Sequence, residues 1–297
     1  MHQNTNKNQP SLHQPVLLEE VLECLNPQRG ERYLDVTAGY GGHASAIVQL
    51  TGTEPTLVDR DDNAVTELQK LFRKTDVRHQ DFLSASRALQ QERARFDMVL
   101  ADLGVSSPHL NEADRGFAFG QEGPLDMRMD NRQELSAETV VNTYSEAEIA
   151  DILWRYGEEP KARQIARLIT GNRPIRTTTQ LAAIVSKAWP GRSRVHPATR
   201  TFQALRIAVN DELGLLERTL PVWLELLNPG GRIAIISFHS LEDAIVKQMF
   251  AERSGDRYDA ELRLLTKRPI TASPQELVSN PRARSAKLRA AVKINKT

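Results

Sequence analysis

The sequence predicts an α/β fold, a parallel sheet with helices on both faces, interrupted by an all-helical insertion. Two observations lead to this prediction. Short apolar runs alternate with helical segments over residues 31–104, and the same alternation resumes after residue 210. Between these stretches the strand pattern stops and the apolar spacing becomes helical.

The first part of the expected sheet contains four strands. A helix should precede them over residues 16–25, where apolar side chains recur on one face. The strands are expected at 32–36, 55–59, 76–79 and 96–102, with helices over 42–50 and 62–73. The run Phe96–Gly104 is apolar almost throughout, which is typical of a buried central strand.

The insertion and the second part of the sheet follow. Residues 105–135 are loop-like and residues 136–210 are helical in pattern, with Ser145 and Glu148 spaced as a capping box. A helix over Leu213–Leu227, a turn at 228–231, a strand at 232–238 and a last strand at 288–294, pairing with it, should complete the sheet. The predicted organisation is thus a sheet domain in two parts, 1–104 and 211–297, a helical domain at 105–210, and a flexible polar tail at 1–14.

Composition limits the class of protein. The 297 residues can form a large core, and a net charge of +1 indicates no partner by itself. A single cysteine excludes a disulfide framework and a cysteine-based zinc site, and no metal site is expected. Cys24 borders the apolar face of the first helix and is expected to be a packed thiol. Without a membrane-length apolar run or a signal peptide, the chain is predicted to be cytoplasmic.

A glycine loop follows the first strand. Gly39, Gly41 and Ala44 satisfy G-x-G-x-x-A, a pattern that also suits a dinucleotide. Asp35, at the end of the strand, favours a different ligand, because a carboxylate there repels a pyrophosphate. S-adenosylmethionine carries an ammonium and a sulfonium and no phosphate, so it suits an acid beside the loop. The alternative is that Asp35 caps the loop backbone and touches no ligand.

Two further acids end strands of the same expected sheet. Asp59 ends the second strand, where an acid can grip both hydroxyls of a ribose, and its alternative role is to cap the next helix. Asp102 ends the fourth. Because ligands of open α/β sheets bind at the carboxyl ends of strands, Asp35, Asp59 and Asp102 are predicted to converge on one crevice.

The basic residues are sorted into two acid-free stretches. Ten lie between Pro160 and Arg206, and six lie between Asn280 and Thr297. Such clusters repel themselves, so a phosphate backbone is the expected partner. The alternative is that both are solvated faces paired with acids elsewhere, such as the Glu-rich helix at 19–23. The basic residues are Lys161, Arg163, Arg167, Arg173, Arg176, Lys187, Arg192, Arg194, Arg200 and Arg206, then Arg282, Arg284, Lys287, Arg289, Lys293 and Lys296.

With a methyl donor, the loop after the fourth strand should hold the chemistry. Methylation of cytosine at C5 needs a cysteine nucleophile, and Cys24 is in the wrong place. Methylation of an exocyclic amine needs an acceptor for its N–H, which Asp102 or a backbone carbonyl supplies, although a cofactor-orienting role for Asp102 is equally open. Phe117 and Phe119 are candidates for base stacking, with domain-interface packing as the favoured alternative. For His239, loop stabilisation is the expected role.

Seven motifs along almost the whole chain resemble one family, the bacterial 16S ribosomal RNA cytosine-N4-methyltransferases of the MraW type. They are His13–Leu17, Gly41–His43, Asp102–Pro108, Gly123–Asp130, His196–Val209, Ser237–Asp243 and Asn280–Ser285. The resemblance implies a class I (Rossmann-like) methyltransferase sheet, S-adenosylmethionine as methyl donor, and one cytidine of the decoding centre of the small ribosomal subunit as substrate. It also implies that the helical insertion recognises substrate, and dimers are known in the family.

By position, the resemblance places the cofactor contacts on Gly41, Gly42, His43, Asp59, Phe82, Asp102 and His109. The chain departs from the pattern twice, since Gln is expected at His109 and an aromatic at Ala38 in many relatives. Both His and Gln form hydrogen bonds. A decoding-centre base must be turned out of its stack, and Arg200 and Arg206 are predicted to help hold the RNA.

Two other functions stay open. The first is an S-adenosylmethionine enzyme that acts on DNA or on a protein. The second is a ribosome assembly factor that uses the sheet domain only to bind RNA, although Asp59 and Asp102 are both present for catalysis.

Overall fold

The computed structural model describes residues 15–191, 195–255 and 258–294, so the predicted tail at 1–14 lies outside it. The chain forms two compact units. A sheet unit is drawn from Met1–Asp59, Asn63–Leu103 and Thr219–Thr297, and a helical unit from Arg60–Asp62 and Gly104–Arg218. The helical unit therefore extends beyond residue 210, and it includes a three-residue segment far from it in the sequence.

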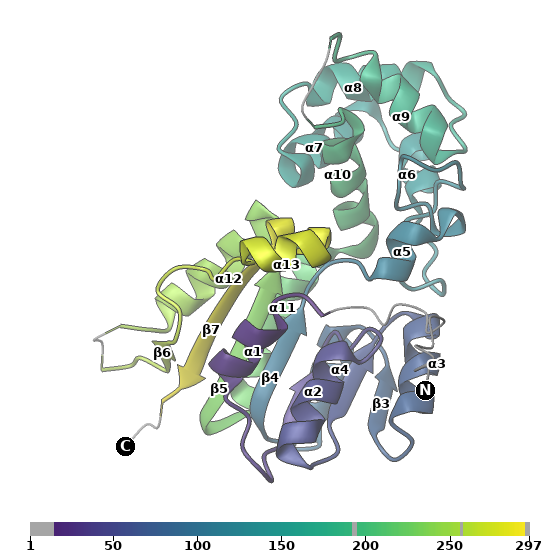
Figure 1. The fold of residues 1–297 in the computed structure, drawn as a ribbon. Helices are drawn as coiled ribbons and strands as arrows, with labels where there is room; N and C mark the ends of the chain where they lie inside the picture. The colour runs from purple at the N-terminus through teal and green to yellow at the C-terminus, as the bar shows by residue number, and fades with distance from the viewer. Residues whose placement is uncertain (1–14, 192–194, 256–257, 295–297) are drawn as a thin grey trace, which may run out of the picture. The chain divides into compact units, whose positions relative to one another are not determined.

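The sheet has seven strands in the order β3-β2-β1-β4-β5-β7-β6 (Figure 1). Strands β1 to β5 pair in parallel, and β7 is antiparallel to both β5 and β6. The predicted α/β fold is confirmed, including the pairing of the last predicted strand with β5. The strands are β1 (Tyr33–Asp35), β2 (Thr56–Asp59), β3 (Asp76–His79), β4 (Phe96–Asp102), β5 (Leu227–Ser237), β6 (Leu262–Leu264) and β7 (Lys287–Lys293).

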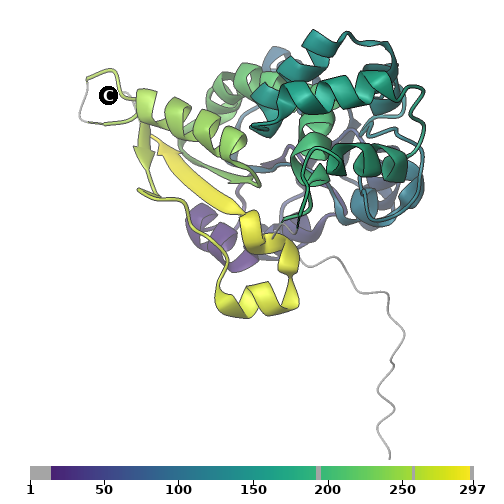
Figure 2. The ribbon, with the colours of Figure 1, turned by 90° about the horizontal axis from the view of Figure 1, so that it is seen from above.

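Helices cover the sheet on two sides. Seen from above, the strand β7 lies between α1 (Leu18–Leu25) on one side and α12 (Ser240–Glu252) on the other (Figure 2). Residues of α1, α2 (Gly42–Thr51) and α3 (Asp62–Leu71) share one core cluster with alternate residues of the strands. The other elements are α4 (Phe82–Gln91), α11 (Glu212–Leu226), α13 (Pro274–Ser279) and the 3₁₀ turn η2 (Pro281–Ser285). The elements β6, α13 and η2 were not predicted from the sequence, because such short segments show no clear periodicity.

The predicted turn at 228–231 is a bulge within β5. Phe96 of β4 pairs with Leu227, and Met98 pairs with Arg232, so 228–231 on β5 lie opposite one residue of β4. Gly230 has a φ of 80°, which a glycine adopts without strain. The prediction of a turn at 228–231 is therefore wrong, because β5 continues through these residues, although Gly230 has the positive φ that is typical of turn glycines.

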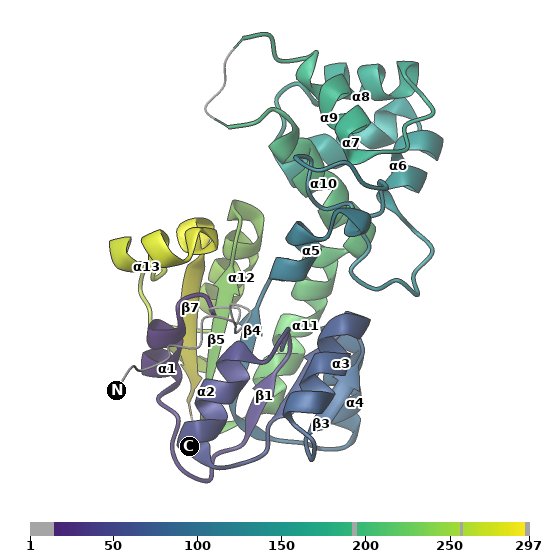
Figure 3. The ribbon, with the colours of Figure 1, turned by 45° about the vertical axis from the view of Figure 1, so that its right-hand side comes forward.

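The helical unit contains α5 (Ser107–Asn111), the 3₁₀ turn η1 (Ala113–Arg115), α6 (Ala137–Thr143), α7 (Glu146–Gly157), α8 (Ala162–Gly171), α9 (Thr178–Ser186) and α10 (Ala198–Asn210) (Figure 3). Its core is an apolar cluster of its own. The capping box of Ser145 and Glu148 is confirmed at the start of α7. The prediction that 105–135 is loop throughout is wrong at α5 and η1, which are too short to show helical periodicity.

The C-terminal basic cluster is largely neutralised within the sheet unit. Arg289 contacts the Asp243 carboxylate at 2.7 Å, and Lys287 contacts it at 3.4 Å. Lys293 donates to the carbonyls of Leu224 and Leu227. Arg289 and Lys287 therefore follow the alternative of pairing with an acid within the fold, although the acid is Asp243 and not the helix at 19–23. Lys293 is held by carbonyls instead, and Lys296 lies outside the described residues.

Replacing Asp243 should therefore destabilise the fold. In Asp243→Ala the Arg289 guanidinium, whose side chain is 10% exposed, loses its buried partner. We expect a loss of about 3–5 kcal/mol in unfolding free energy, measured by denaturant unfolding. The exposed pair of Glu67 and Lys70 is the control, since Glu67→Ala should cost less than about 1 kcal/mol. Equal effects of the two changes would contradict a stabilising role for Asp243.

Candidate active site at the carboxyl edge of the sheet

Three carboxyl groups share one face of the sheet at its carboxyl edge. Asp35 lies opposite Leu57 in β2 and Leu100 in β4. Asp59 and Asp102 follow these two partners by two positions, and side chains two apart on a strand point to the same face. The sheet therefore brings the three predicted acids together.

Asp35 is held by the protein itself. Its carboxylate accepts from the Tyr33 hydroxyl at 2.7 Å and from the Thr37 amide at 3.2 Å, and the residue is 2% exposed. Burial raises its pKa to about 7, and the charge of Asp59 adds to this, against the lowering effect of the two hydrogen bonds. Asp35 thus binds the loop backbone through the Thr37 amide, as its alternative role required, and a contact with a ligand remains a prediction.

The glycine loop is shaped by packing and by Asp59. The Gly39 amide donates to the Asp59 carboxylate at 2.8 Å, which ties the loop to the end of β2. Gly41 has a φ of 77°, and a Cβ there would lie 2.8 Å from the Phe72 ring. A Cβ on Gly42 would lie 2.8 Å from Pro15. Both glycines are required by the fold, whatever they contact in a ligand.

Asp59 is not the cap of the following helix, because α3 begins at Asp62. Its hydrogen bond to Gly39 leaves the carboxylate at the tip of β2, beside the loop. This is the position at which an acid of an open α/β sheet can meet a ribose.

Asp102 is a partly exposed acid with one buried oxygen, since its side chain is 22% exposed and its Oδ1 is buried. Among the described residues, its Oδ1 has no hydrogen-bond partner. Its Oδ2 lies 3.8 Å from the His43 Nδ1. Burial raises the pKa of Asp102 well above its usual value, and the charges of Asp35 and Glu242 raise it further. A buried polar atom without a partner is costly, so Oδ1 is a group that a ligand would satisfy.

His43 connects this acid to the start of α1. Its Nε2 lies 2.9 Å from the Val16 carbonyl oxygen and must donate to it. The other ring nitrogen, Nδ1, lies on the side of Asp102, 3.8 Å from its Oδ2, which is too far for a hydrogen bond. His43 is buried, 6% exposed, and acts here as an orienting neighbour of Asp102.

Phe82 opens α4, where Asp81 caps the helix by accepting from the Leu83 and Ser84 amides. Its ring is half-buried and packs against Trp223 at 5.5 Å between centroids. The structure thus places six of the seven predicted cofactor residues, Gly41, Gly42, His43, Asp59, Phe82 and Asp102, in the sheet unit.

His109 belongs to the helical unit, and both its ring nitrogens have partners there. Nδ1 lies 3.0 Å from the Ser106 hydroxyl, and Nε2 lies 3.0 Å from the Asp61 carboxylate. The side chain is only 6% exposed. The predicted cofactor contact at this position must therefore compete with these two bonds.

The basic stretch of the helical unit is divided between exposed and committed side chains. Arg206 makes a two-pronged ion pair with Glu212, at 2.8 and 2.9 Å. Lys161 lies over the Trp189 ring, and Arg173 donates to backbone carbonyls. The exposed members are Arg163, Arg167, Arg176, Lys187 and Arg200, whereas Arg192 and Arg194 lie outside the described residues.

Comparison with known proteins decides the family. The model of the MraW methylase family matches residues 10–294. The chain belongs to the MraW methylase family. It is 49% identical over 289 residues to the ribosomal RNA small subunit methyltransferase H of Cyanothece sp., which covers 96% of this chain and 95% of that protein. The protein of the same name from Heliobacterium mobile is 44% identical over 308 residues, 95% and 99% of the two chains. The protein of the same name from Acidobacterium capsulatum is 47% identical over 296 residues, which cover 95% of this chain and 98% of that protein.

Other sequence candidates of this family member have structural roles. Phe117 is buried in the core of the helical unit with its ring 4.9 Å from that of His109, and Phe119 stacks on His196 at 4.5 Å. The structure shows packing for both, within the core of the helical unit, and the predicted place at a domain interface is not shown. His239 caps α12 by accepting from the Glu242 amide, as expected for a loop-stabilising residue. Burial and nearby acids raise the pKa of the Cys24 thiol, which fits a packed group.

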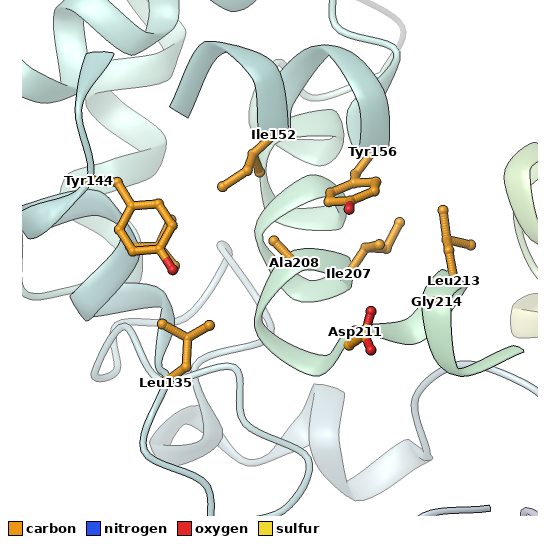
Figure 4. A pocket seen from close by; sticks show the side chains of 10 residues that line it. Leu135, Tyr144, Ile152, Tyr156, Ile207, Ala208, Asp211, Leu213 and Gly214 are labelled. Atoms are coloured by element: carbon orange, nitrogen blue, oxygen red, sulfur yellow. The ribbon is translucent and has the colours of Figure 1, made fainter. Parts of the chain in front are cut away.

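The sequence analysis missed a pocket within the helical unit. It measures about 190 Å³ and has the rings of Tyr144 and Tyr156 on opposite sides (Figure 4). None of the predicted catalytic or cofactor residues lines it. Its walls come from five separate segments, which is why no local motif indicates it. They are Leu135, Val140, Tyr144, Ile152, Tyr156, Ile207, Ala208, Asp211, Leu213 and Gly214. Among the described residues no helix is long and apolar enough to cross a membrane.

The raised pKa of Asp35 predicts a pH-dependent stability. Between its ordinary value of 3.8 and its folded value of about 7, the folded chain holds a proton that the unfolded chain lacks. Stability therefore falls as the pH rises through this window, by at most about 1.4 kcal/mol per pH unit. The Asn side chain of Asp35→Asn cannot ionise. The stability of this variant relative to the parent, measured by thermal unfolding, should therefore increase between pH 5 and 8. A constant difference across that range would contradict the assignment.

Proposed function

We propose that this MraW methylase transfers a methyl group from S-adenosylmethionine to the exocyclic N4 amine of a cytidine in the decoding centre of 16S ribosomal RNA. The family and the names of the relatives support a methyltransferase of small-subunit ribosomal RNA. The single observation that carries the chemistry is the open Oδ1 of Asp102, a buried acceptor at the carboxyl edge of the sheet.

The residues at this edge fit the cofactor. Asp59, fixed by the Gly39 amide, can accept from ribose hydroxyls. The carboxyl groups of Asp35 and Asp102 could face an ammonium and a sulfonium, whose charges would favour the ionised form of both acids, and a pyrophosphate would be repelled beside them. Phe82 offers a half-buried apolar ring. When bound, S-adenosylmethionine supplies a methyl carbon that its sulfonium has already activated.

Asp102 has the properties of the proton acceptor. As the N4 lone pair forms a bond to the methyl carbon, the carbon–sulfur bond breaks and the amine must lose a proton. Oδ1 is free of protein partners among the described residues and can accept the N4–H. Burial and the neighbouring acids raise its pKa, which strengthens it as a base. The sulfonium of a bound cofactor would favour the ionised form that the reaction needs.

The helical unit supplies the RNA-binding surface in this proposal. The exposed arginines of α8 and α10, including Arg163 and Arg200, are available for phosphate contacts. Arg206 is a weaker candidate than the sequence indicated, because its charge is paired with Glu212. Contacts of this kind could offset the few kcal/mol that turning out a stacked base costs.

The first test is nucleoside mass spectrometry of 16S RNA after incubation with S-adenosylmethionine and unmethylated small subunits. The proposal predicts a new N4-methylated cytidine. Methyl transfer onto plasmid or protein instead would favour another substrate, and cofactor binding without transfer would favour an assembly factor. Light scattering in the same buffer would decide whether the chain forms the homodimer known in its family.

Asp102→Asn should separate catalysis from folding. The amide cannot take up the amine proton, so we expect the single-turnover rate to fall about 10²-fold or more. The control is Asp76→Asn, which changes an exposed residue at the amino end of β3, opposite the carboxyl edge of the sheet. If Asp102→Asn keeps the rate of the parent while binding the cofactor, Asp102 is an orienting residue only.

Reversing the exposed charges of α8 and α10 should weaken RNA binding. For Arg163→Glu combined with Arg200→Glu, we expect about a tenfold or greater loss in affinity for small-subunit RNA at low salt, without a change in affinity for S-adenosylmethionine. The matched control is Arg29→Glu with Lys70→Glu, which changes the net charge equally in the sheet unit. Equal losses for both pairs would show that only net charge matters.

A further inference from the structure

The connection between Asp59 and α3 is unusually short and tightly held. Only Arg60 and Asp61 separate the end of β2 from the helix, which begins at Asp62. These residues belong to the helical unit, although the strand before them and most of the helix after them belong to the sheet unit. The chain thus passes directly from the acid at the strand tip into the helical unit.

Asp61 is the anchor of this connection. Its side chain is 3% exposed, and its two oxygens have different partners, His109 Nε2 at 3.0 Å and an Arg115 guanidinium nitrogen at 3.2 Å. Burial alone would raise its pKa, but the hydrogen bond from His109 and the charge of Arg115 hold it below the usual value. An ionised group buried with two partners has few alternative positions.

The partners of Asp61 are themselves fixed. Arg115 also donates to the carbonyls of Arg128 and Met129, both at 3.2 Å. Arg60 donates to the Asn210 carbonyl at 3.2 Å and contacts the Met129 sulfur. The connection is therefore bound to α5, η1, the 128–129 segment and the end of α10.

Asn210 completes the network. Its side chain accepts from the Met129 amide at 2.8 Å and donates to the Met127 carbonyl at 2.7 Å. Met127 has a φ of 60°, which a buried non-glycine residue adopts only when its surroundings hold it there. The segment that receives Arg60 and Arg115 is thus itself a rigid part of the helical unit.

We propose that Asp61 is a positioning residue for Asp59. One side of the Asp59 carboxylate is held by the Gly39 amide. The backbone that carries Asp59 is held on its C-terminal side by the buried pairs of Asp61. The inference rests on the proposed function in one respect, because it takes Asp59 as the group that grips the ribose hydroxyls of the cofactor.

His109 gains a role in this arrangement. The family resemblance implies a cofactor contact at its position, whereas here its Nε2 serves Asp61. Because the side-chain amide of Gln is also a hydrogen-bond donor, His109→Gln should retain the bond to Asp61, and His109→Ala should lose it.

The test compares two probes on the full-length chain by calorimetry. One is S-adenosylhomocysteine and the other is its 2′-deoxy analogue. The affinity for the first divided by the affinity for the second measures how much the ribose hydroxyl contributes to binding. Asp61→Asn should lower this ratio about fivefold or more. A general loss of structure would weaken both probes alike and leave the ratio unchanged. The matched control is Asp151→Asn, which breaks the exposed pair with Arg155 in the same unit and should leave the ratio unchanged.

A double-mutant cycle decides whether Asp61 acts through Asp59. In an Asp59→Asn background, the change Asp61→Asn should have no further effect on the ratio. An additive effect would overturn the inference, as would an unchanged ratio in Asp61→Asn or equal ratios for His109→Gln and His109→Ala. If Asp61→Asn does not fold, the two His109 variants carry the test. Failure of the parent chain to bind S-adenosylhomocysteine would instead refute the proposed function.

Discussion

Burial of carboxyl groups at one edge of the sheet is the constraint on which the site depends. Asp35, Asp59 and Asp102 end neighbouring parallel strands on one face, and each ionised group loses solvation there. The protein offsets this loss of solvation to a different extent for each acid. Asp59 receives an amide, Asp35 receives a hydroxyl and an amide, and Asp102 keeps an oxygen with no partner among the described residues. The least compensated acid is the one best suited to receive a proton.

The two acid-free basic stretches of the chain have different physical explanations. Near the C-terminus, a single buried acid, Asp243, neutralises Arg289 and contacts Lys287, so the cluster stabilises the sheet unit. In the helical unit, Arg206 is paired in the same way, but Arg163 and Arg200 are exposed. An acid-free stretch of sequence therefore indicates a nucleic-acid surface only for those of its members that the fold leaves in solvent.

The two units are joined in a way that links their chemistry. The helical unit includes the residues that follow Asp59, and it holds them by ion pairs in which every member is almost completely buried. Such pairs contribute little net stability compared with apolar packing, but breaking one is costly, which makes them effective at fixing a conformation. This is consistent with a role in setting the direction of an adjacent carboxylate.

Local patterns in the sequence were sufficient for every strand except β6, most helices, the glycine loop and the acids at the strand ends, because periodicity and turn chemistry act over a few residues. They were sufficient also for the family, whose motifs run along the chain. Only the tertiary structure decided which atoms are in contact. Asp243 and Arg289 are 46 positions apart, and Arg60 and Asn210 are 150 apart, so no local pattern could have paired them. The open oxygen of Asp102, the occupied nitrogens of His109 and the anchoring of Asp61 arise from such distant contacts, because burial and partners exist only once the chain has folded.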